Sequence, residues 1–224
     1  MERHFETEMQ ALKNRLLSMG AMVEERVHQA VVALMERNPE AAERIIAGDE
    51  EVNDLQIEVD DRCLKLLALQ QPMASDLRLI TAAMKINADL ERIGDQAVNI
   101  AENALKMMNA PPLKPIIDLP RMAELAEGMT RDSLDAFVRK DPALARSVLG
   151  RDDEVDQLKD HIFRVLLTYM MADPGTIERA LGLILVSRNL ERIADHATNI
   201  AEDVIFVVEA KDVRHHHEES GTRS

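Results

Sequence analysis

The chain has 224 residues, of which 46% are hydrophobic and 2% aromatic, and its formal net charge is −14. This apolar content excludes a disordered polymer, and the acidity with no Trp and one Tyr argues against nucleic acid as a partner. A single cysteine excludes an internal disulfide, and neither a signal-peptide core nor an apolar run of ~18 residues is present, so we expect a cytoplasmic protein.

Six helices are predicted from apolar residues that recur about every 3.6 positions and from sparse Pro and Gly breaks. Asn38–Pro39 and Asp141–Pro142 are each typical of an N-cap followed by Pro at the first helical position. An apolar set of aliphatic residues and 13 Met favours helices over a β-sandwich. The expected helices span residues 3–37, 39–70, 73–109, 119–140, 142–171 and 175–210.

The two halves of the chain repeat one another. NPEAAERIIAGDEEV at 38–52 aligns with DPALARSVLGRDDEV at 141–155, and LERIGDQAVNIAE at 90–102 aligns with LERIADHATNIAE at 190–202. Self-similarity on this scale indicates a duplicated unit, so we predict an elongated all-α fold of two tandem three-helix bundles. The predicted parts are 1–110 (first repeat), 111–117 (Pro-rich linker), 118–212 (second repeat) and 213–224 (flexible tail).

Each LERI segment carries a stripe of oxygen-bearing side chains opposite its apolar face. Acids stand four positions apart where a solvated helix usually has Glu followed by Lys, a like-charge spacing that costs a few tenths of a kcal/mol. The second predicted helix of each half adds a companion i,i+4 pair, Asp49 with Asn53 and Asp152 with Asp156. The stripes are Glu91, Asp95, Asn99 and Glu102 in the first copy and Glu191, Asp195, Asn199 and Glu202 in the second.

Neighbouring helices that each offer such a pair can hold cations between them. Carboxylate and amide oxygens, without a repeated His or Cys, favour Mg²⁺, Mn²⁺, Ca²⁺ or iron over zinc or copper. His196 is not counted as a ligand, because Gln96 takes its place in the other copy. A solvated acidic face of an amphipathic helix is the alternative interpretation, and spacing alone does not choose between the two.

The sequence resembles the PhoU family. The resemblance rests on the paired LERI segments, AGDEEVN and GRDDEVD upstream of them, PMASDLRLITAAMKI, LLTYMMADPGTIERA and the ending AKDVRH, and it covers positions 5–215. It implies two three-helix bundles related by a pseudo-twofold, and a homodimer. It also implies a non-enzymatic regulator that connects the ATPase subunit of the phosphate ABC transporter to a membrane sensor histidine kinase. Such a protein represses the phosphate-starvation response, and contacts the membrane only peripherally, through its partners.

The resemblance further implies multinuclear metal clusters, of iron or of zinc, manganese or magnesium, bound by paired E(D)-x-x-x-D motifs. Asn53 departs from the motif because it brings no charge, and Glu50 with Asp54 offers a version shifted by one position around the helix. The ligands implied residue by residue are Asp49, Asn53, Glu91, Asp95, Asp152, Asp156, Glu191 and Asp195.

Two other functional classes are alternatives for this sequence. A carboxylate-bridged metalloenzyme on a helical scaffold would need two Glu-x-x-His motifs, whereas only Glu25 with His28 forms one. A purely structural helical dimer would leave the stripes facing solvent. Cys63 lies on an apolar face and is predicted to be a buried thiol, and His215–His217 are assigned to a flexible polar tail.

Overall fold

The computed structural model describes residues 2–70, 72–113, 118–211 and 213. These residues form α-helices and one short 3₁₀ helix, with no strand among them, so the predicted all-α class is confirmed. The elements are α1 (Glu2–Glu36), α2 (Pro39–Ala47), α3 (Asp49–Gln70), α4 (Ala74–Met107), α5 (Asp118–Arg139), α6 (Pro142–Leu149), α7 (Asp152–Ala172), η1 (Pro174–Thr176) and α8 (Ile177–Glu209).

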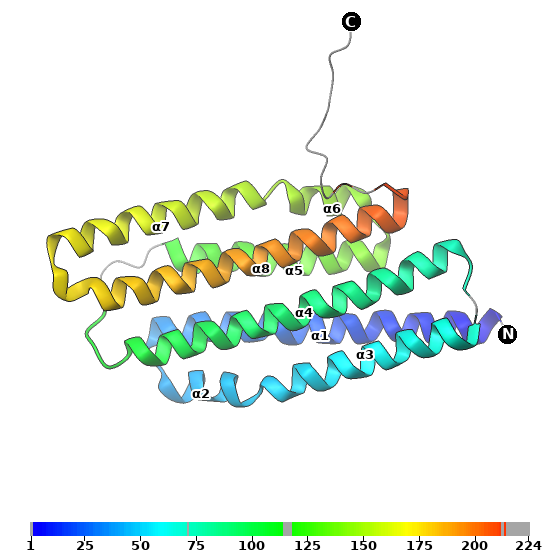
Figure 1. Ribbon diagram of the computed structural model, residues 1–224, viewed down its shortest axis with the longest axis horizontal. Coiled ribbons are helices and arrows are strands. Elements are labelled where there is room, and N and C mark those ends of the chain that lie inside the picture. The colour runs from blue at the N-terminus through cyan, green and yellow to red at the C-terminus, as the bar shows by residue number, and fades with distance from the viewer. Residues whose placement is uncertain (1, 71, 114–117, 212, 214–224) are drawn as a thin grey trace, which may run out of the picture.

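The helices form two tandem bundles that lie side by side along their lengths (Figure 1). The first bundle comprises α1, α4 and the α2–α3 pair, and the second comprises α5, α8 and the α6–α7 pair. Helices α4 and α8 pack against each other, as do α1 and α5, so these four helices make the centre of the molecule. The broken pairs α2–α3 and α6–α7 cover opposite outer sides.

The prediction of one continuous second helix in each half is wrong. The helix predicted over 39–70 is interrupted at Gly48, whose N–H bonds Arg44 O at 3.0 Å, and the helix predicted over 142–171 is interrupted at Gly150 and Arg151. Glycine often follows a helix end, and three acids in the first turns of α3 and α7 stabilise new helix N-termini. The breaks place Asp49 and Asp152 at the start of new helices.

The remaining boundaries differ by smaller amounts. The last helix begins at Ile177 instead of residue 175, because a turn of 3₁₀ helix follows Asp173, whose Oδ1 accepts the Gly175 N–H at 2.9 Å. Within the predicted tail, Val213 is half-buried against the core. The rest of that tail, including His215–His217, and residues 114–117 of the predicted linker lie outside the described residues.

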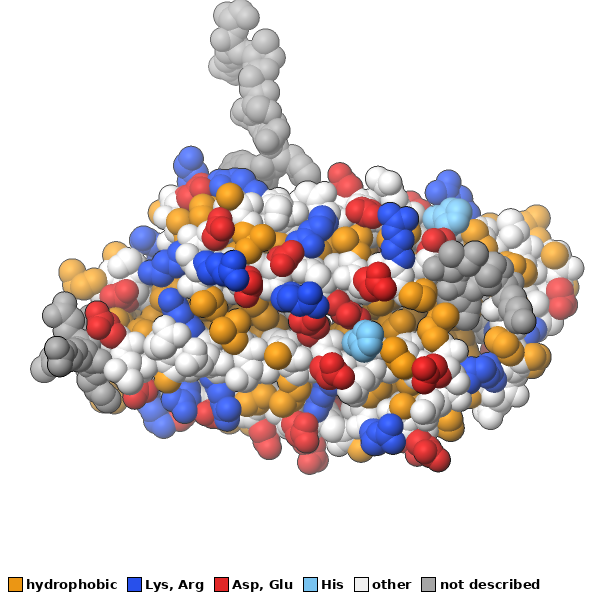
Figure 2. Space-filling model, turned by 180° about the vertical axis from the view of Figure 1, so that it is seen from behind, with side chains coloured by type: hydrophobic (Ala, Val, Ile, Leu, Met, Phe, Trp, Pro, Cys, Tyr) orange, Lys and Arg blue, Asp and Glu red, His pale blue; other side chains and the backbone are white. Residues whose placement is uncertain are grey.

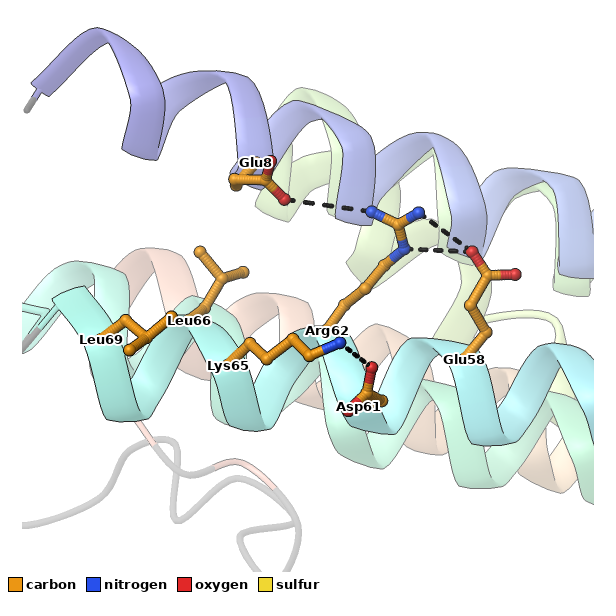
Figure 3. A pocket seen from close by; sticks show the side chains of 7 residues that line it. All are labelled: Glu8, Glu58, Asp61, Arg62, Lys65, Leu66 and Leu69. Carbon is orange, nitrogen blue, oxygen red and sulfur yellow. Dashed lines mark hydrogen bonds and ion pairs between the residues drawn. The ribbon is translucent and has the colours of Figure 1, made fainter.

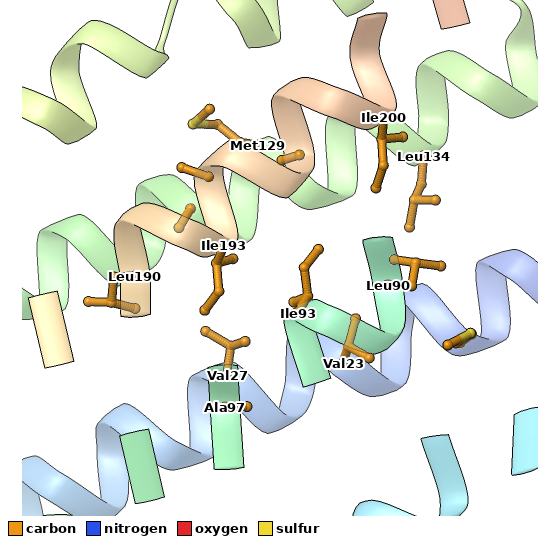
Figure 4. Packing of buried hydrophobic residues seen from close by; sticks show 14 of the residues in the cluster. Val23, Val27, Leu90, Ile93, Ala97, Met129, Leu134, Leu190, Ile193 and Ile200 are labelled. Atoms are coloured by element: carbon orange, nitrogen blue, oxygen red, sulfur yellow. The ribbon is translucent and has the colours of Figure 1, made fainter. Parts of the chain in front are cut away.

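One continuous apolar core runs through both bundles. Figure 4 shows side chains from all four central helices meeting there, among them Ile93 of α4 and Ile193 of α8, both fully buried. Cys63 is also fully buried, as predicted, and burial raises the pKa of its thiol to about 12. The two halves therefore share one hydrophobic core and are not separate globular units.

Polar contacts also cross between the halves. His196 Nδ1 lies 2.8 Å from Asp89 Oδ1, and Lys85 Nζ lies 2.8 Å from an Asp203 carboxylate oxygen.

No helix within the described residues is long and apolar enough to cross a membrane.

Replacing Asp141 with Ala is expected to lower the free energy of unfolding by about 1 kcal/mol. The Asp141 Oδ1 atom accepts the N–H groups of Ala143 and Leu144 at 2.9 and 3.0 Å, and these amides at the start of α6 lose that partner in the variant. Urea unfolding followed by circular dichroism measures the change. Gln157→Ala, at an exposed position on α7, is the control and should stay within ~0.5 kcal/mol of the wild type. An equal loss in both variants would contradict the capping role.

Candidate metal site

The first cluster consists of Asp49 and Asn53 on α3 with Glu91 and Asp95 on α4. Helix α3 packs against α4, and all four side chains are half-buried. The Asn53 amide donates to Asp49 Oδ2 at 3.2 Å, which holds the α3 pair together. The structure thus brings the two predicted i,i+4 pairs of the first half to the same contact between helices.

Burial and neighbouring negative charges raise the pKa values of the two α4 acids in the first cluster. The pKa of Glu91 is raised, first by loss of solvation and then by the negative charges of Asp95 and Asp49. The pKa of Asp95 is raised by loss of solvation and by Asp49, while Arg92 and His196 oppose both shifts. Asp49 is therefore within electrostatic reach of both acids on α4, and a cation placed there would relieve the repulsion.

The second cluster consists of Asp152 and Asp156 on α7 with Glu191 and Asp195 on α8. Loss of solvation and then the charge of Asp195 raise the pKa of Asp152, while loss of solvation followed by Glu191 and Asp156 raises that of Asp195. Acids on α7 and α8 thus raise each other's pKa values, whereas in the first half the effect runs from Asp49 on α3 to the acids of α4. The second half therefore contains the same two-helix arrangement of acids.

A lysine lies within the second cluster. Lys159 Nζ donates to Asp156 Oδ1 at 2.7 Å and to Glu191 Oε1 at 2.9 Å, joining α7 to α8. These hydrogen bonds raise the pKa of the Lys159 ammonium, so it stays charged. The sequence analysis missed this residue, although its spacing of three from Asp156 and seven from Asp152 places it on the same helix face.

The remaining stripe residues and the shifted pair Glu50 and Asp54 lie in more varied surroundings. Glu50 and Asp54 are exposed, and Glu102 is exposed beside Lys106, 3.9 Å away. The Asn199 amide donates to Asp89 Oδ1 at 3.4 Å, so it takes part in the contact between the halves. Asn99 and Glu202 are half-buried one and two turns further along the stripes.

The donor chemistry fits a hard cation, because each cluster presents carboxylate oxygens from two facing helices and no Cys or His. Among the described residues, however, no group of three or more His, Cys, Asp or Glu is placed ready to hold a metal ion. The acids of each cluster would therefore have to draw together around an ion. Metal binding by these clusters stays a prediction.

A separate cavity of about 350 Å³ lies between α1 and α3 (Figure 3). Arg62 bonds Glu58 at 3.0 Å and lies 3.9 Å from Glu8, while Lys65 pairs with Asp61. The charged side chains that line this cavity are thus paired among themselves, which gives it no free positive charge for a small anion such as phosphate.

Comparison with known proteins places this architecture in a family. The sequence model of the PhoU domain matches the chain twice, at residues 16–104 and 119–204. The chain belongs to the PhoU family. Its two matched segments each contain one of the acidic clusters, and the resemblance seen in the sequence is confirmed.

Relatives and solved structures in the PhoU family match nearly the whole chain. A phosphate-specific transport system accessory protein PhoU homolog of Aquifex aeolicus is 42% identical over 94% of this chain and 95% of its own length. The phosphate-specific transport system accessory protein PhoU of Escherichia coli is 36% identical over 94% of this chain and 88% of its own length. The crystal structure of PhoU from Pseudomonas aeruginosa has a TM-score of 0.89 and 39% identity, covering 92% of this chain and all of the other.

Proposed function

We propose that this protein is a non-enzymatic, metal-binding regulator of phosphate uptake that couples the phosphate ABC transporter to a sensor histidine kinase. The transport role is supported by the relatives, which are named accessory proteins of the phosphate-specific transport system. The metal-binding part is supported by one observation above the others. In each half an acid on one helix lies close enough to raise the pKa of an acid on the other helix.

The metal in this proposal has a structural task. The first cluster would hold it through Asp49, Glu91 and Asp95, and the second through the corresponding acids of α7 and α8. A bound divalent ion supplies positive charge that offsets the crowded carboxylates. Side chains bound to one ion would hold the start of α3 against the middle of α4. A partner that contacts these helices would therefore meet a different surface charge with and without metal.

The surface supports contacts with proteins more than with nucleic acid. Figure 2 shows acidic and basic side chains interspersed over one face, without a continuous basic patch. Helices α7 and α8 also expose large apolar side chains at i,i+4,i+8 spacing, and such rows commonly occur where proteins contact one another. These residues are Phe163, Leu167 and Met171 on α7 and Ile177, Leu181 and Leu185 on α8.

The proposal places the chain beside the transporter's ATPase subunit and the sensor kinase, as a homodimer. To test it, full-length wild type is compared with the variant Glu91→Gln, Asp95→Asn, Glu191→Gln, Asp195→Asn. Both are loaded with Mn²⁺, dialysed, analysed for metal and used to capture the purified ATPase subunit. We expect the wild type to retain Mn²⁺ and capture the subunit, and the variant to lose both properties.

The control for this experiment is Glu50→Gln, Asp54→Asn, which removes two exposed acids just outside the first cluster. His215–His217 are present in every protein compared, so metal bound there contributes equally. Equal Mn²⁺ content in wild type and the four-residue variant would show that the clusters are not the metal sites. Equal capture despite lost metal would show that the contact does not depend on metal.

A further inference from the structure

The two clusters differ at two corresponding positions. At an offset of 103 residues, Asn53 of the first cluster corresponds to Asp156 of the second, and Gln56 corresponds to Lys159. The second cluster therefore gains one carboxylate and one ammonium relative to the first. The first cluster has three acids, and the second has four acids and one lysine, so both clusters have the same formal charge of −3.

The extra charges of the second cluster are in contact. The Lys159 ammonium bonds a carboxylate of α7 and a carboxylate of α8, so it bridges the two helices that a metal ion in this cluster would bridge. The side chains of Lys159 and Glu191 are about one-quarter exposed, which limits screening of their contact, whereas the side chain of Asp156 is 54% exposed. In the first cluster the corresponding Gln56 carries no charge.

We propose that Lys159 is a built-in cation of the second cluster, so that the first cluster binds divalent metal more tightly and fills first. This inference rests on the proposed metal-binding function. An ion entering the second cluster must displace the ammonium from two carboxylates, or bind without them. An ion entering the first cluster displaces no cation. The first cluster lacks one carboxylate because it has Asn53, but it also lacks a lysine that would compete with the metal ion.

Unequal clusters would give the protein two ranges of metal response. At low metal concentration the α3–α4 contact is occupied, while the α7–α8 contact is held by Lys159. At higher concentration the second contact exchanges its ammonium for metal. The surface of the second half would then change over a different concentration range from that of the first.

Calorimetric titration of the full-length, metal-free protein with Mn²⁺ tests the inference. We expect the wild type to show a tight class of sites, removed by Glu91→Gln, Asp95→Asn, and a weaker class, removed by Glu191→Gln, Asp195→Asn. Lys159→Gln, which reproduces Gln56 of the first half, should strengthen the weaker class by roughly tenfold. Lys159→Arg should leave it weak.

Lys65→Gln is the control for loss of one lysine charge, because Lys65 is exposed on α3 and pairs only with Asp61 among the described residues. Thermal denaturation of each metal-free variant verifies that the fold is kept. Equal affinity of the two classes in the wild type, or no change in Lys159→Gln, would overturn the role of Lys159 and leave metal binding standing. Absence of Mn²⁺ binding in wild type and in Lys159→Gln would overturn the proposed function together with this inference.

Discussion

Replacing Ile193 with Ala is expected to lower the free energy of unfolding by ~2–5 kcal/mol. Ile193 is fully buried on α8, and its side chain points into the core that both bundles share (Figure 4). Truncation removes apolar contacts and leaves a cavity that the long central helices cannot collapse to fill. A single domain is commonly stable by only ~5–15 kcal/mol, so this one change would remove a large share of the total.

Urea unfolding of Ile193→Ala and of its counterpart Ile93→Ala measures this effect. Ile93 is equally buried, on α4. Because the core is continuous, we expect each variant to unfold in one transition and not to melt one half alone. Ile57→Ala on α3 is the control, since the side chain is 66% exposed and its loss should change stability by less than ~0.5 kcal/mol. Two separate transitions in Ile193→Ala would show that the bundles fold independently.

The duplication made most of this fold predictable. Helix periodicity and the repeated LERI segments were enough to place α1, α4, α5 and α8 within a few residues of their ends. The breaks after α2 and α6 were missed because apolar periodicity continues across them. The signal was local: a run of acids follows Gly48 directly, and another follows Gly150 after one arginine.

Tertiary features were harder to predict than helices. Spacing within one helix showed which acids share a face, but the pairing of Asp49 with the acids of α4 depends on how α3 packs. The Asp89–His196 contact joins residues more than 100 positions apart and has only Asn189 and Gln96 as its counterpart in the repeat. Lys159 was overlooked because acids are the expected ligands of a hard cation, whereas a lysine ammonium takes the place of the cation itself.

The acids of the first cluster are expected to destabilise the metal-free protein near neutral pH. The pKa values of Glu91 and Asp95 are raised above their ordinary values, so the folded chain binds protons more readily there than the unfolded chain. By linkage, this contribution to stability falls as pH rises from about 4 through the raised values. The double variant Glu91→Gln, Asp95→Asn should therefore melt at a higher temperature than wild type without metal at pH 7, and lose that advantage near pH 4.

Adding metal should reverse this order of stability. At a Mn²⁺ concentration 100 times its dissociation constant, binding stabilises the wild type by ~2.7 kcal/mol, or roughly 5–10 °C for a chain of this size. The double variant has lost its tight class of sites and should gain far less. Thermal denaturation with and without Mn²⁺ measures both effects, with Glu50→Gln, Asp54→Asn as the charge-matched control. If the double variant were the less stable protein without metal, the acids would be serving the fold; if the order of stability reverses on adding Mn²⁺, they are kept for the ion, at the expense of stability in its absence.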